Sequence, residues 1–156
     1  MANWCELEIT IWTANPENLT RQLQKKLTEA KERNHGLFIG SDRYLFDGQV
    51  DFNGRSVMVF GDVKWCFSKD EMEKFVEFIR QLDSTLQAID VEYLEVGCEL
   101  FGHYHYENGW LVHTFIDDDF PEWQEDDDEF YKKLATALEN SGVEENWEVG
   151  YGLDDV

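Results

Sequence analysis

Three histidines lie within the stretch "FGHYHYENGWLVHTF", where polar and apolar residues alternate as they do on a half-buried β-strand. His103 and His105 are two positions apart, so both side chains point to one face, as ligands of a zinc ion could. A two-residue Asn-Gly turn at 108–109 pairs Tyr104 with His113, which places His113 on the opposite face. One hairpin therefore cannot bring all three histidines to one metal ion.

A metal site on this strand would need a further ligand, and Cys98 and Glu99 are the nearest candidates. A small metal-binding protein or hydrolase that uses His103, His105 and Cys98 is therefore one alternative. The absence of enzyme motifs argues against a hydrolase, because the chain has no GxSxG, P-loop, GxGxxG or HExxH motif. With 34 acids, carboxylate pairs at catalytic spacing arise by chance. We expect no enzyme, no catalytic residue, no metal and no cofactor.

The second distinctive stretch is "DDDFPEWQEDDDEFYKK", which begins at Asp117 and has nine acids among its first thirteen residues. A calcium-binding EF-hand loop needs oxygen ligands at alternate positions and a glycine at position six. Counted from Asp117, positions five and six are Pro121 and Glu122; counted from Asp126, position five is Phe130. The stretch is therefore not an EF-hand.

Large apolar side chains interrupt this acidic run. A segment that only keeps a protein in solution does not need Phe120 and Trp123. Aromatic residues ringed by charge are typical of protein-binding surfaces, where the rings supply buried area and the charges steer the partner. We expect the partner-binding residues to be Asp117, Asp118, Asp119, Glu122, Trp123, Glu125, Asp126, Asp127 and Asp128.

The net charge of -21 is unevenly distributed. Residues 1–89 carry 14 acids and 11 bases, whereas residues 90–156 carry 20 acids and only two bases. Such a surface repels nucleic acid and anionic membranes, so we expect no direct binding to either. One turn of duplex DNA, about 35 Å long, carries about 20 negative charges, which is comparable to the excess of acids over bases in residues 90–156. A surface formed by these residues could therefore occupy the basic groove of a nucleic-acid-binding protein.

The length of 156 residues predicts one domain with its own core. No apolar run reaches the ~20 residues of a membrane span, and the start "MANWCELEIT" lacks the regions of a signal peptide, so we expect a cytoplasmic protein. Three cysteines without CxxC spacing favour buried free thiols over a disulfide framework.

The elements that must position these residues are readable from periodicity. "WCELEITIW" alternates as a strand, and "NPENLTRQLQKKLTEAKER" predicts a helix with Asn15 as N-cap and Pro16 at its first position. "QVDF" and "SVMVFGDVKWCF" predict two strands joined across Asn53 and Gly54. Ser68 begins a capping box before a second helix, and "IDVEYLEVGCEL" predicts the next strand.

Three further elements complete the expected order: a hairpin at 101–117, a third helix at 128–142 that ends at Gly142, and a last strand in "NWEVGYGL". The pattern predicts an α+β fold: a ferredoxin-like split βαβ (β-α-β-β-α-β) over residues 1–98, extended by an acidic hairpin, helix and strand over residues 99–156. The sheet is expected to be largely antiparallel, in a single domain.

Three short motifs, "NWC" at 3–5, "VKWCFSKDEMEKF" and "EYLEVGCELFGHYHYENG", resemble the Api92-like, YubB-type ferredoxin-like family of phage and plasmid proteins. The resemblance covers residues 1–116. It implies a ferredoxin-like fold and a mobile-element origin, and brings no catalytic residues.

The function expected from these features is a non-enzymatic, acidic protein-binding module. Its partner would be a basic host or phage protein that binds nucleic acid, blocked by mimicry in the manner of an anti-CRISPR or anti-restriction protein. The remaining alternative is a structural or regulatory phage or plasmid protein without mimicry, which could form a homodimer through an open sheet face.

Overall fold

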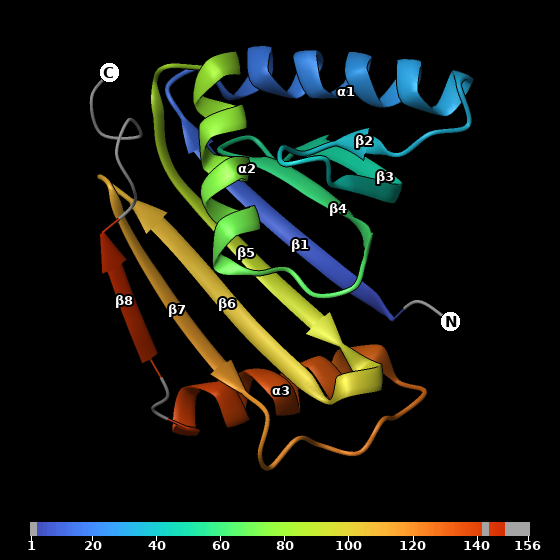
Figure 1. The fold of residues 1–156 in the computed structure, drawn as a ribbon, viewed down its shortest axis with the longest axis vertical. Helices are drawn as coiled ribbons and strands as arrows, with labels where there is room; N and C mark the ends of the chain where they lie inside the picture. The colour runs from blue at the N-terminus through green and yellow to red at the C-terminus, as the bar shows by residue number, and fades with distance from the viewer. Residues whose placement is uncertain (1–2, 142–143, 149–156) are drawn as a thin grey trace.

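The computed structural model describes residues 3–141 and 144–148 of the chain. The elements in these ranges are β1 (Trp4–Thr13), α1 (Pro16–Glu32), β2 (Leu37–Phe38), β3 (Tyr44–Phe52), β4 (Val57–Lys64), α2 (Lys69–Leu82), β5 (Leu86–Glu95), the 3-10 turn η1 (Val96–Cys98), β6 (Leu100–Glu107), β7 (Trp110–Ile116), α3 (Asp127–Ser141) and β8 (Glu144–Glu148). The strands form one antiparallel sheet in the order β2-β3-β4-β1-β5-β6-β7-β8 (Figure 1).

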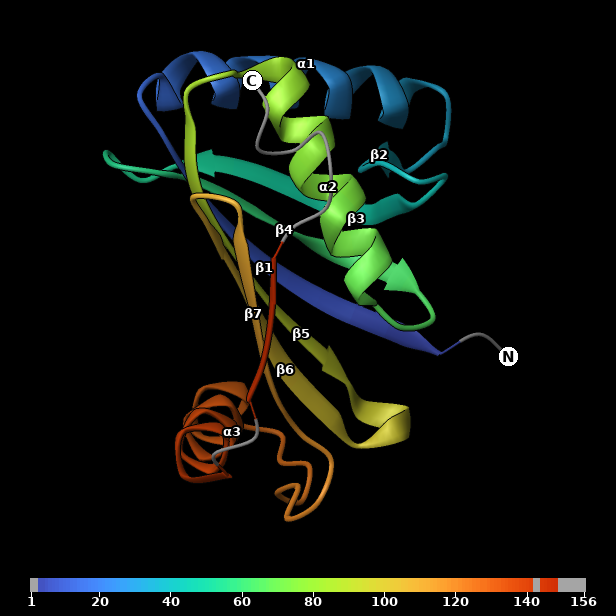
Figure 2. The same cartoon turned by 60° about the vertical axis from the view of Figure 1, so that its left-hand side comes forward.

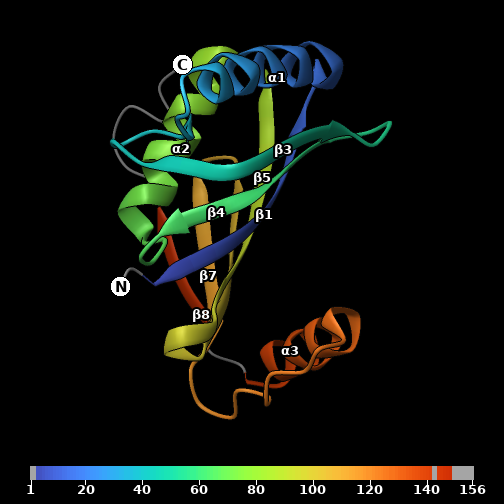
Figure 3. The same cartoon turned by 90° about the vertical axis from the view of Figure 1, so that its right-hand side faces the viewer.

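The helices are divided between the two faces of the sheet. Helices α1 and α2 cover one face, and α3 lies against the lower end of the other (Figures 2 and 3). The main core lies beneath α1 and α2, where Leu19, Phe75 and Ile79 pack against buried strand residues. A smaller core beneath α3 consists of Leu94, Phe101, Ile116, Phe130 and Leu134.

Strand β1 alternates as its sequence predicts. Cys5, Leu7, Ile9 and Ile11 are buried beneath the helices, and the residues between them face the other side of the sheet. We call the part of this second face beyond α3 the open sheet face. It comprises Glu6, Glu8, Thr10, Trp12, Met58, Phe60, Asp62, Asp90, Glu92, His103 and His105.

Both N-terminal helices begin where local chemistry predicts. In α2 the Ser68 hydroxyl accepts a hydrogen bond from the backbone N–H of Glu71, and the Glu71 carboxylate accepts one from the backbone N–H of Ser68. Pro16 is the first residue of α1, although the Asn15 side chain does not cap the helix and instead donates to the Thr85 hydroxyl. The predicted capping box is confirmed.

The two Asn-Gly hairpins are also confirmed. Strands β3 and β4 pair up to Phe52 and Val57 on either side of the first. The second is a two-residue turn with Glu107 opposite Trp110 and Tyr104 opposite His113, the predicted register. Asn108 has φ 50° and Gly109 φ 82°, a left-handed conformation that these residue types tolerate.

Three boundaries differ from the prediction. Strand β3 begins at Tyr44, well before "QVDF". A bulge between Phe46 and Gln49 shifts the side-chain alternation, so the first half of the strand shows no regular pattern in the sequence. The predicted strand in "IDVEYLEVGCEL" ends at Glu95, and η1 follows before the left-handed residue Glu99. The last strand begins at Glu144, two residues before "NWEVGYGL", and is confirmed up to Glu148; the rest of "NWEVGYGL", like Gly142, lies outside the described residues.

The chain is thus α+β, with three helices and an antiparallel sheet over the ranges described. Strand β2, which the sequence did not predict, interrupts the expected β-α-β-β-α-β order. No helix among the described residues is long and apolar enough to cross a membrane.

Candidate functional site

The predicted acidic segment is a surface connection between β7 and α3. All nine expected partner-binding residues are exposed. Asp127 and Asp128 belong to the first turn of α3, where carboxylates interact favourably with the helix dipole, and Asp126 accepts a hydrogen bond from the backbone N–H of Glu129. These three acids therefore also stabilise a helix, whereas no hydrogen bond of Asp117, Asp118, Glu122 or Glu125 occurs within the described ranges.

Aromatic contacts hold this connection against α3. The rings of Phe120 and Trp123 lie 5.9 and 5.0 Å from the ring of Phe130, which is fully buried. Trp123 nevertheless remains 52% exposed. Its ring therefore fixes the backbone of the acidic connection and still offers a surface to a partner.

A tyrosine connects the acidic segment to the open sheet face. The Tyr131 hydroxyl of α3 donates a hydrogen bond of 2.6 Å to the Glu6 carboxylate of β1. Burial raises the pKa of Tyr131, and the hydrogen bond to Glu6 and the charges of Glu6, Glu8 and Asp127 raise it further. Tyr131 therefore links α3 to β1, and carboxylates from both elements act on this one side chain.

Carboxylates face each other across the strands of the open sheet face. Glu8 of β1 lies directly opposite Glu92 of β5, and Glu6 lies opposite Asp62 of β4. Burial raises the pKa of Glu8, and the charges of Glu92 and Glu6 add to that effect. Burial likewise raises the pKa of Asp62, helped by Glu6 and Asp47. Like charges in directly opposed positions destabilise a sheet, so this arrangement costs stability.

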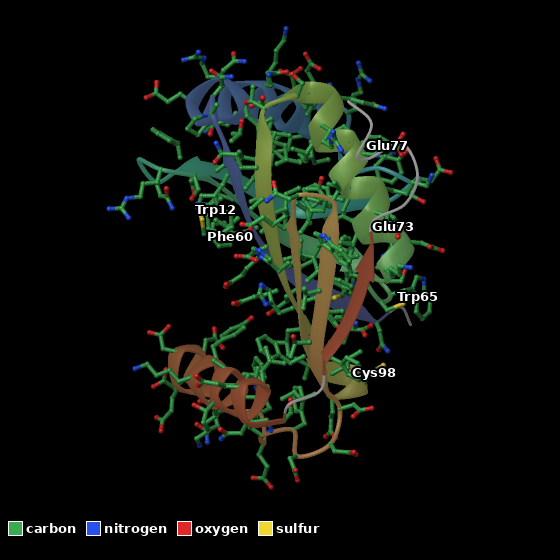
Figure 4. All side chains as sticks on the ribbon, turned by 90° about the vertical axis from the view of Figure 1, so that its left-hand side faces the viewer. Trp12, Phe60, Trp65, Glu73, Glu77 and Cys98 are labelled. Carbon is green, nitrogen blue, oxygen red and sulfur yellow. The ribbon has the colours of Figure 1, made fainter. Side chains whose placement is uncertain are left out.

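Large apolar side chains lie beside these acids. Trp12 and Phe60 project from the side of the sheet that α3 occupies, away from Glu73 and Glu77 of α2 (Figure 4). Both rings are half-buried, so part of each is accessible on the open sheet face. The surface therefore combines negative charge with aromatic area, the two properties predicted for the acidic segment alone.

The histidine pair is placed as predicted, but its partner was missed. Nε2 of His103 lies 3.0 Å from an Asp90 carboxylate oxygen, and Nδ1 of His105 lies 2.5 Å from the same oxygen. Burial alone would raise the pKa of Asp90, but the hydrogen bonds from both histidines hold it below its ordinary value. Asp90 comes from another strand, so only the β5–β6 register, with Asp90 opposite His105, could have revealed it.

The proposed third ligand does not join this pair. The Cys98 thiol lies in η1 at the far end of β6 and accepts a hydrogen bond from the Asn3 side chain. No group of three or more His, Cys, Asp or Glu side chains in the described part of the chain is arranged to hold a metal ion. His113 lies on the opposite face as predicted, where its Nε2 lies 2.6 Å from the Tyr93 hydroxyl and its ring stacks on Tyr104.

The cysteines only partly match the expectation of buried thiols. All three are free, but Cys66 and Cys98 are exposed and only Cys5 is buried. Burial raises the pKa of Cys66, and the charges of Glu95 and Glu71 raise it further. This side chain is therefore a thiol at neutral pH, a weaker nucleophile than a thiolate.

Comparisons with protein-family models, with curated proteins and with solved structures give no match to this chain.

Proposed function

We propose that this protein is a non-enzymatic binding module that presents an acidic surface to a basic protein. The surface consists of the acidic connection and the first turn of α3, residues 117–128, together with the open sheet face. The partner would itself bind nucleic acid, and the module would block it as a nucleic-acid mimic of the anti-CRISPR or anti-restriction type.

One observation carries this proposal: the Tyr131 hydroxyl of α3 donates a hydrogen bond to Glu6 of the sheet, and the charges of Glu6, Glu8 and Asp127 all act on this tyrosine. Across the described residues, Glu6, Glu8, Asp62 and Glu92 form no ion pair with Lys or Arg. A sheet that places Glu8 opposite Glu92 loses stability, and such local violations are expected where function requires them. A basic partner would relieve the repulsion.

The fold is consistent with the origin that the sequence resemblance implies. We propose that residues 1–98 are a ferredoxin-like core, on the basis of the order β3-β4-β1-β5 and of α1 and α2 on one face. Strand β2 would then be an addition at one edge, and β6, β7 and β8 an addition at the other. A phage or plasmid protein of this kind would have host defence proteins among its targets.

The test compares two variants that lose the same number of charges. One replaces Asp117, Asp118, Glu122 and Glu125 by Asn or Gln; the other replaces Glu17, Glu29, Glu32 and Glu77 on the helical side. The immobilised protein is incubated with purified restriction and CRISPR effector proteins, and bound effectors are challenged with duplex DNA and with salt. The mimic hypothesis predicts that DNA displaces the partner and that only the first variant loses binding.

Circular dichroism must show native folding for both variants. Equal loss in the two variants would indicate a simple net-charge effect, and a captured partner that duplex DNA does not displace would argue against mimicry. If no effector binds and the protein forms a dimer that Trp12→Ser disrupts, the open sheet face serves self-association instead.

A further inference from the structure

A hollow of about 350 Å³ lies at the end of the molecule farthest from the acidic connection. It is bounded by the C-terminal half of α1, by β2 and by α2, which lie close together in Figure 2. The volume is at the lower end of the range, about 300–1,000 Å³, for small-molecule sites. Its main lining side chains are Lys26, Arg33, His35, Phe38, Tyr44 and Phe78.

We call this hollow the α1–β2 pocket. One of its walls is aromatic. The Phe38 ring lies 5.5 Å from the Phe78 ring and 5.8 Å from the Tyr44 ring, both edge to face, and the His35 ring lies 4.5 Å from Tyr44. Phe38 remains 41% exposed although it contacts two aromatic neighbours. The wall therefore offers an accessible ring surface on which a flat ligand could stack.

The lining of the pocket also carries cations. Lys26 and Arg33 of the α1 region are exposed, and neither forms an ion pair in the described ranges. Glu29 also lines the pocket, and the C-terminal end of a helix dipole disfavours anions. Two full positive charges outweigh one carboxylate and the partial charge of a helix end. The lining is thus net cationic in a chain whose net charge is -21.

The combination of an aromatic wall and two available cations defines a class of ligand. Arg and Lys bind phosphate and carboxylate groups, and aromatic faces stack with flat rings. We propose that the α1–β2 pocket binds a small anion that carries a flat ring, of which a nucleoside monophosphate is the representative. This site is independent of the acidic surface and of the function proposed for it.

The test is a titration of the purified protein with adenosine monophosphate, followed by isothermal calorimetry and by backbone amide shifts. We expect saturable binding with a Kd on the order of 0.1–1 mM, as befits a shallow site, and shifts at residues 26–44. Adenosine and inorganic phosphate, each lacking one half of the recognised chemistry, should bind at least about tenfold more weakly.

Two variants of equal charge supply the control. Arg33→Gln removes a lining cation and should weaken binding about tenfold, the loss of one charge-assisted hydrogen bond, whereas Lys31→Gln in the last turn of α1 should leave it unchanged. Phe38→Ala should weaken binding without affecting inorganic phosphate. No saturable binding up to about 10 mM, equal losses in Arg33→Gln and Lys31→Gln, or phosphate binding as tight as that of the nucleotide would each overturn the proposal.

Discussion

At the scale of single residues, Asp83 links three parts of the chain. Its carboxylate accepts hydrogen bonds from the Thr13 hydroxyl at the end of β1, and from the backbone N–H and hydroxyl of Thr85 before β5. Its own backbone N–H bonds to Ile79 at the end of α2. Burial alone would raise the pKa of Asp83, but these hydrogen bonds hold it below its ordinary value.

Asp83→Ala should therefore lower the free energy of unfolding by about 1–3 kcal/mol, because it leaves the threonine donors without their acceptor. A carboxyl whose folded pKa is depressed stabilises above its unfolded pKa and loses that contribution as the pH falls through the folded value. The deficit of the variant, measured by urea unfolding, should thus be full at pH 7 and shrink below about pH 4. Glu77→Ala, on the exposed side of α2, is the control, and an equal loss there would contradict the assignment.

A second residue-scale prediction concerns Gly102 in β6. A Cβ built on this glycine would lie 2.2 Å from the hydroxyl oxygen of Tyr93, so the glycine makes room for the tyrosine ring. Gly102→Ala should displace Tyr93, disturb its hydrogen bond to His113, and lower stability by about 1–3 kcal/mol. Gly54→Ala, which meets no neighbouring atom but has φ 94°, separates this clash from backbone strain. Unchanged near-ultraviolet dichroism in Gly102→Ala would show that Tyr93 had not moved.

Some residues of the candidate site can be predicted from the sequence, whereas others depend on how distant strands pair. The exposure of the acids between Asp117 and Asp128 and the opposite facing of His113 follow from local composition and from one two-residue turn. Asp90 and the Glu8–Glu92 pair were not predicted as part of any site, because each depends on the register between strands far apart in the chain. Register between distant strands is a tertiary property that period-two alternation does not determine.

At the scale of elements, the pairing of β1 with β5 leads to a prediction in which stability and binding change in opposite directions. Glu92→Lys replaces a like-charged pair with an oppositely charged one across from Glu8. We expect the free energy of unfolding to rise by about 0.5–1 kcal/mol, since opposed like charges destabilise a sheet and opposite charges stabilise it. The same change should weaken binding of a basic partner, which would meet a lysine.

The control is Glu77→Lys, which changes the net charge equally on the helical side shown in Figure 4. Thermal and urea unfolding of both variants distinguish a local pair effect from general relief of negative charge. If Glu77→Lys stabilises as much as Glu92→Lys, the β1–β5 pair has no special cost and this support for the proposed function is lost.

Elements whose ends are set by local chemistry are the ones that this sequence predicts. Helix α2 and the hairpin between β6 and β7 were predicted because their ends are set by local chemistry, a capping box and an Asn-Gly turn. The first half of β3 was missed because Asp47, with φ 52°, lies in a bulge that shifts the alternation of facing. Strand β2 was missed because two residues are too few to show a period.

At the scale of the whole molecule, the excess of negative charge makes stability depend on pH. Burial and neighbouring carboxylates raise the pKa of Glu8 and Asp62, and burial raises that of Glu95 although Arg43 opposes it. A carboxyl with a raised folded pKa binds more protons in the folded state than in the unfolded state. The free energy of unfolding therefore increases as the pH falls toward the ordinary values of 4.5 for Glu and 3.8 for Asp.

Asp83 and Asp90 act in the opposite sense, because their folded pKa values are lowered and their contributions disappear only in more acidic solution. The two sets of groups therefore place the maximum of stability on the acid side of neutrality. We expect the melting temperature, followed by circular dichroism at constant ionic strength, to rise between pH 7.5 and about pH 5.5 and to fall below about pH 4.

The dependence of the melting temperature on salt is a second test of carboxylate repulsion, since salt screens exposed carboxylates without protonating them. The Debye length shortens from about 30 Å at 0.01 M to about 8 Å at 0.15 M, so the melting temperature at pH 7.5 should rise over this range, and rise less at pH 5.5. Glu92→Lys should show a smaller salt effect than the unaltered protein, because one of the opposed pairs is gone. A melting temperature that falls from pH 7.5 to pH 5.5, with no response to salt at either pH, would show that carboxylate repulsion does not govern the stability of this fold.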